Sequence, residues 1–167
     1  MLEDLLSLGK LEEGLIQAKP EVFDFNKFVT EISSEMQELA KKGQKIILNN
    51  LVQVEPYTDK RLVKNVLLNL IGNAIKFSDE DGSILINCSA NDEAMSIAVA
   101  DSGIGISDED KEHLFERFFR AHNAANIQGT GLGLHIISKY LELLDGKISI
   151  ESELGKGSTF TVVIPIK

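Results

Sequence analysis

Three polar side chains share one face of a helix that the sequence predicts from about Asp59 onward. Asn69, Asn73 and Lys76 are spaced at i, i+4 and i+7, while apolar residues occupy the opposite face. Amide oxygens and an ammonium group suit a site where a hard cation meets phosphate oxygens, because Mg²⁺ takes oxygen ligands and retains several waters. A solvated helix face has the same spacing, so this cluster alone leaves both interpretations open.

A first glycine cluster, Asp101-Ser102-Gly103-Ile104-Gly105, directly follows an apolar predicted strand. Glycines allow the backbone to approach a flat ligand closely, and they permit turns with positive φ. A carboxylate at the end of the strand can accept a hydrogen bond from an exocyclic amine. Tight turns use the same residues, so a binding site and a structural turn both remain open.

A second glycine cluster, Gly129-Thr130-Gly131-Leu132-Gly133-Leu134, opens another predicted helix. Glycines before a helix expose backbone N–H groups beside the positive end of the helix dipole, which favours an anion there. The spacing matches neither the dinucleotide fingerprint nor a P-loop. Capping alone explains three glycines in five residues poorly, so the cluster favours an anion site over a purely structural role, with both open.

Between the glycine clusters lies the segment Phe115-Glu116-Arg117-Phe118-Phe119-Arg120. Its aromatic residues are expected to anchor the segment to the core. Arg117 and Arg120 are three residues apart, and guanidinium groups so placed could reach a phosphate.

Apolar periodicity and turn residues predict the elements that position these clusters. Helices are expected at 2–17, 28–40, 59–75, 110–119 and 136–144, and strands at 46–48, 84–88, 95–100, 147–151 and 159–166, with a short extended piece at 22–25. Strands at both ends with helices between them indicate a mixed sheet covered by helices, an α+β sandwich. The helix at 2–17 either packs on its own domain or ends a longer bundled segment, and its pattern fits both.

Composition narrows the class of protein. The 167 residues include 17 Lys and Arg and 26 Asp and Glu, which gives a net charge of −9. A net negative charge disfavours binding to the phosphate backbone of a nucleic acid. A single cysteine, Cys88, excludes an internal disulfide and a zinc site with several cysteine ligands. The sequence shows no long apolar run and no signal peptide, so we expect a soluble, cytoplasmic chain.

In their order, the four clusters resemble the ATP-binding catalytic domains of sensor histidine kinases, within the superfamily shared by gyrase, Hsp90 and MutL. Asn69–Lys76 is similar to the N box of that family, Asp101–Gly105 to the first glycine box, Phe115–Arg120 to the F box, and Gly129–Leu134 to the second glycine box. The segment Gly155–Phe160 also resembles the final hairpin of the family.

This resemblance, over residues 23–167, implies a two-layer α/β sandwich of the Bergerat type with helices on one face of a mixed sheet. The segment 106–128 would form a long lid over ATP. Asn69, Asn73 and Lys76 would be catalytic, with Asn73 as the Mg²⁺ ligand and Asp101 on the adenine amino group. The implied contacts to the nucleotide are Asn69, Asn73, Lys76, Phe77, Asp101, Gly103, Ile104, Gly105, Arg117, Arg120, Gly129, Thr130, Gly131, Leu132, Gly133 and Leu134.

The resemblance also indicates what this chain leaves to a partner. In the gyrase, Hsp90 and MutL branches a Glu one turn before the metal-binding Asn activates water, but here that position holds Asn69, which is no general base. The phosphoacceptor His of the family precedes an acidic residue on a helical hairpin. His113, His122 and His135 precede Leu, Asn and Ile, so none fits.

We therefore expect residues 1–19 to be the end of the dimerisation and phosphoacceptor domain, and residues 20–167 to be the ATP-binding catalytic domain. The implied partners are that dimerisation domain and the receiver domain of a response regulator, not nucleic acid. The parent protein is expected to be a homodimer, commonly anchored in the inner membrane with this domain in the cytoplasm. The alternatives are an anti-sigma-type serine-protein kinase of the same superfamily and a non-catalytic nucleotide-binding interaction module.

Overall fold

A five-stranded mixed sheet forms one layer of the protein, in a computed structural model that describes residues 2–50, 52–124, 127 and 129–166. Its spatial order is β2 (Lys45–Asn50), β4 (Ser83–Ala90), β5 (Ala94–Asp101), β7 (Gly157–Pro165) and β6 (Lys147–Glu153). β2 pairs with β4 in parallel, and the other neighbours are antiparallel. Asp101 lies in register with Ser158, so the end of β5 adjoins the start of β7.

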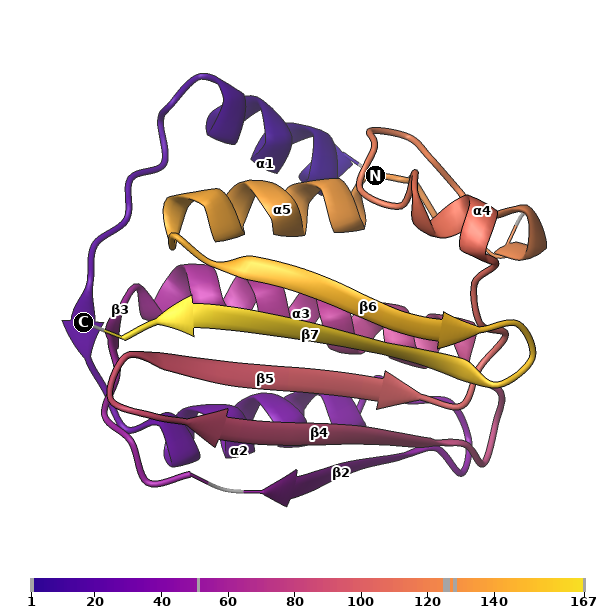
Figure 1. Ribbon diagram of the computed structural model, residues 1–167, viewed down its shortest axis with the longest axis horizontal. Coiled ribbons are helices and arrows are strands. Elements are labelled where there is room, and N and C mark those ends of the chain that lie inside the picture. The colour runs from indigo at the N-terminus through magenta and orange to yellow at the C-terminus, as the bar shows by residue number, and fades with distance from the viewer. Residues whose placement is uncertain (1, 51, 125–126, 128, 167) are drawn as a thin grey trace.

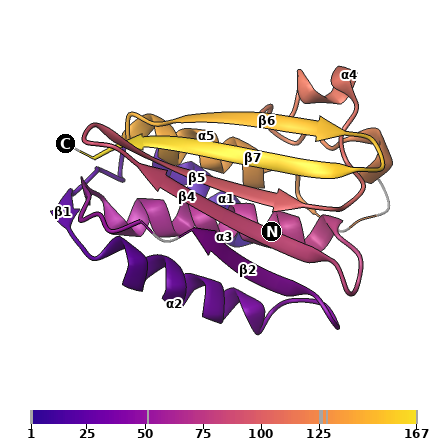
Figure 2. The same cartoon turned by 60° about the horizontal axis from the view of Figure 1, so that its bottom comes forward.

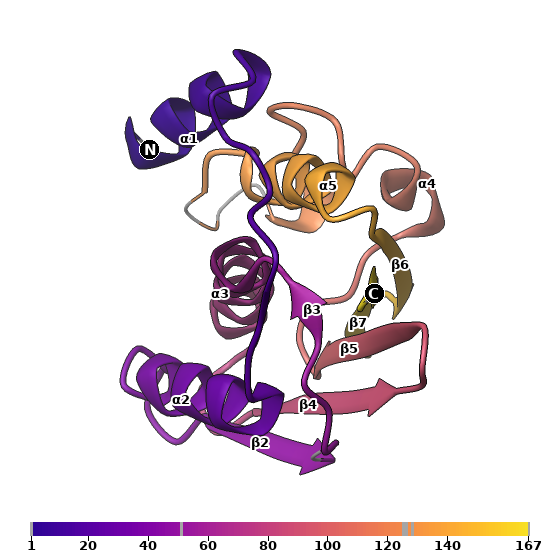
Figure 3. The same ribbon diagram turned by 90° about the vertical axis from the view of Figure 1, so that its left-hand side faces the viewer.

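Helices cover one face of this sheet (Figures 1 and 3). They are α2 (Phe25–Gln37) against β2, α3 (Lys60–Phe77) along the centre, and α5 (Gly133–Leu143) against β6. α1 (Leu2–Glu12) packs on the outer side of α5, as Figure 3 shows. A separate two-stranded sheet pairs β1 (Glu21–Val22) with β3 (Tyr57–Thr58).

The core lies between the sheet and the helices. Alternate residues of β4 and β5 are buried, among them Ile84, Ile86 and Ile97, while the residues between them are partly or fully exposed. This two-residue period is that of a sheet with one covered face. Figure 2 shows the sheet passing over the helices as a twisted layer. The predicted two-layer α+β sandwich is therefore confirmed.

Both ends of α3 are fixed by buried polar side chains. At the start, Asp59 accepts hydrogen bonds from the backbone N–H groups of Arg61 (2.9 Å) and Leu62 (3.3 Å), a standard N-cap. Burial alone would raise the pKa of Asp59, but the Arg61 guanidinium and backbone donors, including Lys19 N–H, outweigh it and lower that pKa.

At the other end of α3, the buried amide of Gln44 donates to the carbonyls of Ile75, Ser78 and Asp79 at 3.1–3.2 Å. The Lys41 ammonium donates to the carbonyls of Lys76 (2.9 Å) and Ser78 (2.6 Å). The carbonyls of Ile75, Lys76 and Ser78 are ones that the helix end leaves without partners, and a cation there also suits the helix dipole. The α2–β2 connection thus holds the end of α3 in place.

Two predicted helices are wrong in extent. The first helix ends at Glu12 rather than at residue 17. Two residues later, Gly14 takes a φ of +69°, which is not helical. The helix expected at 110–119 is only α4 (Asp108–Lys111), which is followed by turns. Phe118 has a φ of 65°, which lies outside the α-helical range. The other predicted helices and strands are confirmed, with boundaries shifted by a few residues. No helix in the described ranges has the length and apolarity needed to cross a bilayer.

Replacing Gln44 tests the cap on α3. Gln44→Ala removes the partner of three carbonyls and of the Lys41 N–H group, which donates to Gln44 Oε1 at 2.8 Å. We expect a loss of about 3 kcal/mol in the free energy of unfolding, or roughly 6–12 °C in Tm, measured by thermal denaturation. The exposed neighbour substitution Lys42→Ala should leave Tm nearly unchanged. An unchanged Tm for Gln44→Ala would contradict the assigned cap.

Candidate functional site

A central cavity of about 800 Å³ opens between α3, the end of β5, the segment 106–130 and the start of α5. Most of the residues predicted to contact a nucleotide line it. They are Asn69, Asn73, Lys76, Phe77, Asp101, Ile104, Gly105, Arg120, Gly129, Thr130, Gly131, Gly133 and Leu134. Four clusters that lie far apart in the sequence are thus brought together around one hollow.

One end of the central cavity collects amide oxygens and an ammonium group. A Cβ at Gly133 would lie 3.8 Å from the Asn69 amide oxygen and 3.9 Å from that of Asn73. A Cβ at Gly129 would lie 3.4 Å from the Lys76 ammonium. The polar stripe of α3 therefore faces the second glycine cluster across the cavity, an arrangement suited to a cation and an anion bound together.

The first residues of α5 form the opposite wall at this end. Its N-cap position, Leu132, makes no side-chain capping bond, and Gly133 and Leu134 line the cavity. The first N–H groups of a helix have no partner within it and carry the positive end of the helix dipole. An anion bound here would meet backbone donors as well as Lys76.

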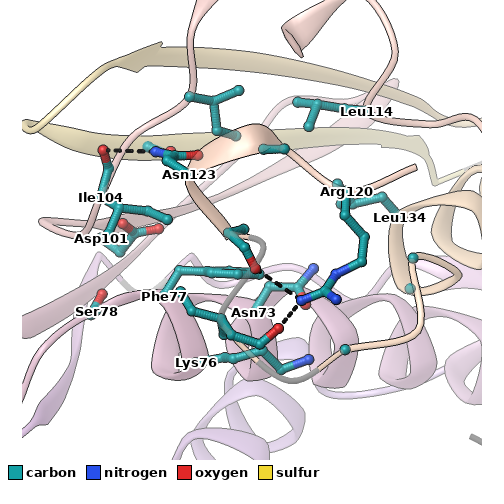
Figure 4. A pocket seen from close by; sticks show the side chains of 18 of the residues that line it. Asn73, Lys76, Phe77, Ser78, Asp101, Ile104, Leu114, Arg120, Asn123 and Leu134 are labelled. Atoms are coloured by element: carbon teal, nitrogen blue, oxygen red, sulfur yellow. Dashed lines mark hydrogen bonds between the residues drawn. The ribbon is translucent and has the colours of Figure 1, made fainter. Parts of the chain in front are cut away.

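The other end of the central cavity contains Asp101. Its carboxylate accepts a hydrogen bond from Gly103 N–H at 2.9 Å. Burial raises the pKa of Asp101, and the backbone N–H groups of Gly103 and Ser158 offset part of that rise. The side chains of Phe77 and Ile104 lie nearby in Figure 4, so a carboxylate stands beside an apolar surface. That combination suits a flat heterocycle with an amine.

Three glycines of the two clusters pack against protein backbone. A Cβ at Gly103 would lie 2.3 Å from the Phe77 carbonyl oxygen, and one at Gly105 would lie 2.0 Å from that of Glu153. Gly131 has the same constraint against Phe118, with 2.6 Å to its carbonyl carbon. These glycines let loops approach each other, whereas Gly129 and Gly133 face side chains of α3.

The predicted lid folds over the cavity through its own polar contacts. The Arg120 guanidinium donates to the carbonyls of Ala124 (2.9 Å) and Ile127 (Figure 4). The Asn123 amide donates to the carbonyl of Gly105 (2.9 Å). The buried Asp110 accepts from the backbone N–H (3.0 Å) and ring nitrogen (2.8 Å) of His122, which lowers the pKa of that carboxyl. Residues 125, 126 and 128 of the predicted lid lie outside the described residues.

α1 contacts the site with two carboxylates. Asp4, which lines the central cavity, accepts a hydrogen bond from the Thr130 hydroxyl at 3.1 Å. Glu12 forms an ion pair with Arg117. The buried Leu8 lies between these two positions along the helix. α1 thus contacts both the F box segment and the second glycine cluster.

Three predicted nucleotide contacts do not line the cavity. Gly103 packs on the end of α3, Leu132 is completely buried in the core, and Arg117 pairs with Glu12. Their contact with a nucleotide stays a prediction that this geometry does not support directly.

Sequence reasoning missed several lining residues, including Asp4, Lys41, Ser78, Asn123, Ser158 and Phe160. Of these, Ser78 directly follows the N box segment and Ser158 pairs with Asp101, so both could have been found by extending the motifs. Lys41 and Asp4 come from distant elements and carry no local signal. No group of three or more His, Cys, Asp or Glu that could hold a metal occurs among the described residues.

Comparison with known proteins places this geometry in a family. The sequence model of the "Histidine kinase-, DNA gyrase B-, and HSP90-like ATPase" family matches residues 58–167. The circadian input-output histidine kinase CikA of Synechococcus elongatus is 34% identical over 172 residues, which cover 99% of this chain and 23% of CikA. The sensor histidine kinase RcsC of Escherichia coli is 34% identical over 171 residues, covering 99% of this chain and 18% of RcsC. The chain thus spans about a fifth of these relatives' length.

Solved structures show the same relationship. The catalytic domain of histidine kinase ThkA matches with a TM-score of 0.74 and 31% identity, over 89% of this chain and 96% of that domain. Full-length ShkA, in complex with AMPPNP, matches with a TM-score of 0.83 and 29% identity, over 97% of this chain and 34% of ShkA. Since the family model covers most of the chain and the ThkA domain matches almost end to end, the chain belongs to the histidine kinase-, DNA gyrase B- and HSP90-like ATPase family, as an ATP-binding catalytic domain of the histidine kinase type.

Proposed function

We propose that this domain binds ATP with Mg²⁺ in the central cavity and transfers the γ-phosphoryl group to a histidine on a separate dimerisation domain. The observation that carries the proposal is the convergence of Asn69, Asn73 and Lys76 on the N-terminus of α5, with Asp101 at the far end of the same cavity. One end suits phosphates and the other suits adenine. The complex of ShkA with AMPPNP supports nucleotide binding by a domain of this kind.

Each group then has a distinct task. The Asn73 amide oxygen would hold Mg²⁺, with Asn69 beside it and the Lys76 ammonium on a phosphate. The fit is chemical, because neutral oxygens on a rigid helix leave room for the waters that Mg²⁺ retains. Bound Mg²⁺ would neutralise charge on the phosphate oxygens. Asp101 would accept a hydrogen bond from the adenine amine, and Arg120 could exchange its carbonyl partners for a phosphate.

The absence of a base at Asn69 supports phosphoryl transfer over hydrolysis. The Asn69 side chain donates to the Asn65 carbonyl at 2.8 Å, and an amide takes up no proton from water at neutral pH. The catalytic contribution would be positioning and charge neutralisation. The acceptor would come from the dimerisation domain, of which we propose residues 1–19 are the final part, and residues 20–167 the catalytic domain. A receiver domain would be the next partner, and the parent protein a homodimer.

Incubation with γ-labelled ATP tests this division of labour. Alone, the domain should bind ATP, label none of its own histidines and release phosphate slowly, since general-base assistance is worth roughly 10²–10⁴-fold. Adding a histidine-bearing dimerisation domain should give acid-labile phosphohistidine on that partner. Acid-stable label on serine would instead favour the anti-sigma type of kinase, and no ATP binding at millimolar concentration would exclude both kinase functions.

Asn73→Ala should remove the Mg²⁺ dependence of ATP binding. Calorimetry of the unchanged domain should show tighter ATP binding with Mg²⁺ than with a chelator, and the variant should bind equally weakly in both. Asn65→Ala is the matched control, because Asn65 lies two turns earlier on α3 and outside the cavity lining. If Asn73→Ala kept the Mg²⁺ effect, another group would hold the ion.

Asp101→Asn should weaken ATP binding by about 10- to 100-fold, since a hydrogen bond to a charged group contributes roughly 1.5–3 kcal/mol. Tm should stay equal or rise, because burial raises the pKa of Asp101 and folding therefore disfavours its ionised form. Because the pKa of Asp101 is raised, its carboxylate takes up a proton at a higher pH than an ordinary Asp, whose pKa is 3.8. The ATP affinity of the unchanged domain should therefore begin to fall at a pH above 3.8 when the solution is acidified. Asp92→Asn, on an exposed hairpin turn, serves as control. A lowered Tm with unchanged affinity would refute the base-binding role.

A further inference from the structure

The hydroxyl group of Ser78 is buried without a hydrogen-bond partner. The residue is 1% exposed. In the described part of the chain three buried side-chain atoms are left unpaired in this way, namely Asn26 Oδ1, His135 Nε2 and Ser78 Oγ. Of the three, only Ser78 lines the central cavity. A buried polar group without a partner costs free energy, so a ligand that supplies one gains affinity there.

The backbone of Ser78 is held firmly while its hydroxyl stays unused. Ser78 is the C-cap of α3, and its N–H group donates to the Ala74 carbonyl at 3.2 Å. Its own carbonyl accepts from the Lys41 ammonium at 2.6 Å and the Gln44 amide at 3.2 Å. Every backbone group of this residue is therefore engaged. The hydroxyl group is therefore held in a fixed place by the backbone but makes no hydrogen bond within the protein.

Ser78 lies on the same side of the cavity as Asp101. Figure 4 shows both on one side of Phe77, away from Asn73 and Arg120. Adenine carries an exocyclic amine, a donor, next to the ring nitrogen N1, an acceptor. A carboxylate that accepts and a hydroxyl that donates match that pair of groups, whereas guanine offers a carbonyl and an N–H in their place.

We propose that Ser78 is a second base-reading residue, whose hydroxyl donates to adenine N1 while the Asp101 carboxylate accepts from the amine. This inference rests on the proposed function, since it assumes that ATP occupies the cavity with its base at the Asp101 end. It assigns adenine selectivity to two residues from separate elements, the C-cap of α3 and the end of β5.

Ser78→Ala should weaken ATP binding without lowering the stability of the domain. Since a hydrogen bond between neutral groups contributes modestly, the dissociation constant for Mg-ATP should rise about three- to tenfold. Tm should stay equal or rise, because the hydroxyl has no partner to lose. Ser33→Ala is the matched control. Its hydroxyl donates to the Val29 carbonyl at 2.8 Å on α2, away from the cavity, so ATP affinity should not change.

An ATP analogue tests the contact without depending on any variant. In 1-deaza-ATP a C–H group replaces N1 and the amine remains. The unchanged domain should bind this analogue about three- to tenfold more weakly than ATP, and Ser78→Ala should bind both alike, within roughly twofold. Equal binding of ATP and 1-deaza-ATP by the unchanged domain would overturn the proposal, as would an undiminished ATP affinity in Ser78→Ala. If the unchanged domain bound no ATP, the proposed function itself would fail.

Discussion

The central cavity depends on a backbone contact that only glycine permits. At Gly131 the main chain passes so close to Phe118 that a Cβ would lie 2.6 Å from the Phe118 carbonyl carbon, and its φ is +73°. The Phe118 N–H group donates to the Gly131 carbonyl at 2.9 Å. This contact ties the middle of the polar segment between β5 and α5 to the end of that segment. It therefore fixes where α5 begins, and hence which backbone donors face α3.

The opposite wall has a similar dependence on long-range contacts. α3 carries two Asn residues, which are mediocre helix formers, on its cavity face. Its other face buries residues such as Leu67 and Ile71 completely, and this packing offsets the weak local propensity. Asp59 and Gln44 then fix the two ends. The packing of its apolar face and the hydrogen bonds at its two ends thus fix α3, and with it the positions of Asn69, Asn73 and Lys76.

Local pattern predicted the sandwich and the order of its elements, because period-2 strands and period-3.6 helices are recognisable within short windows. The family resemblance of the four clusters implied 13 of the 26 described residues that line the cavity. What neither could predict comes from contacts between distant segments. Gln44 and Lys41 gain their roles only when β2 lies beside the end of α3. Gly103 and Gly105 looked like ligand-facing glycines, yet backbone of Phe77 and Glu153 fills the space beside them. Arg117 was expected to reach a phosphate, but in the structure it forms an ion pair with Glu12 of α1.

The contacts of α1 link the helix to whatever occupies the cavity. Asp4 holds the Thr130 hydroxyl and Glu12 holds Arg117, so two carboxylates sit on groups that suit phosphate oxygens. Like charges disfavour a carboxylate and a phosphate on the same donor, and the net charge of −9 gives no general compensation. An anion that takes either group must displace the α1 carboxylate from it. This effect is reciprocal by thermodynamic linkage. The free energy by which α1 weakens the binding of such an anion equals the free energy by which the bound anion weakens the docking of α1.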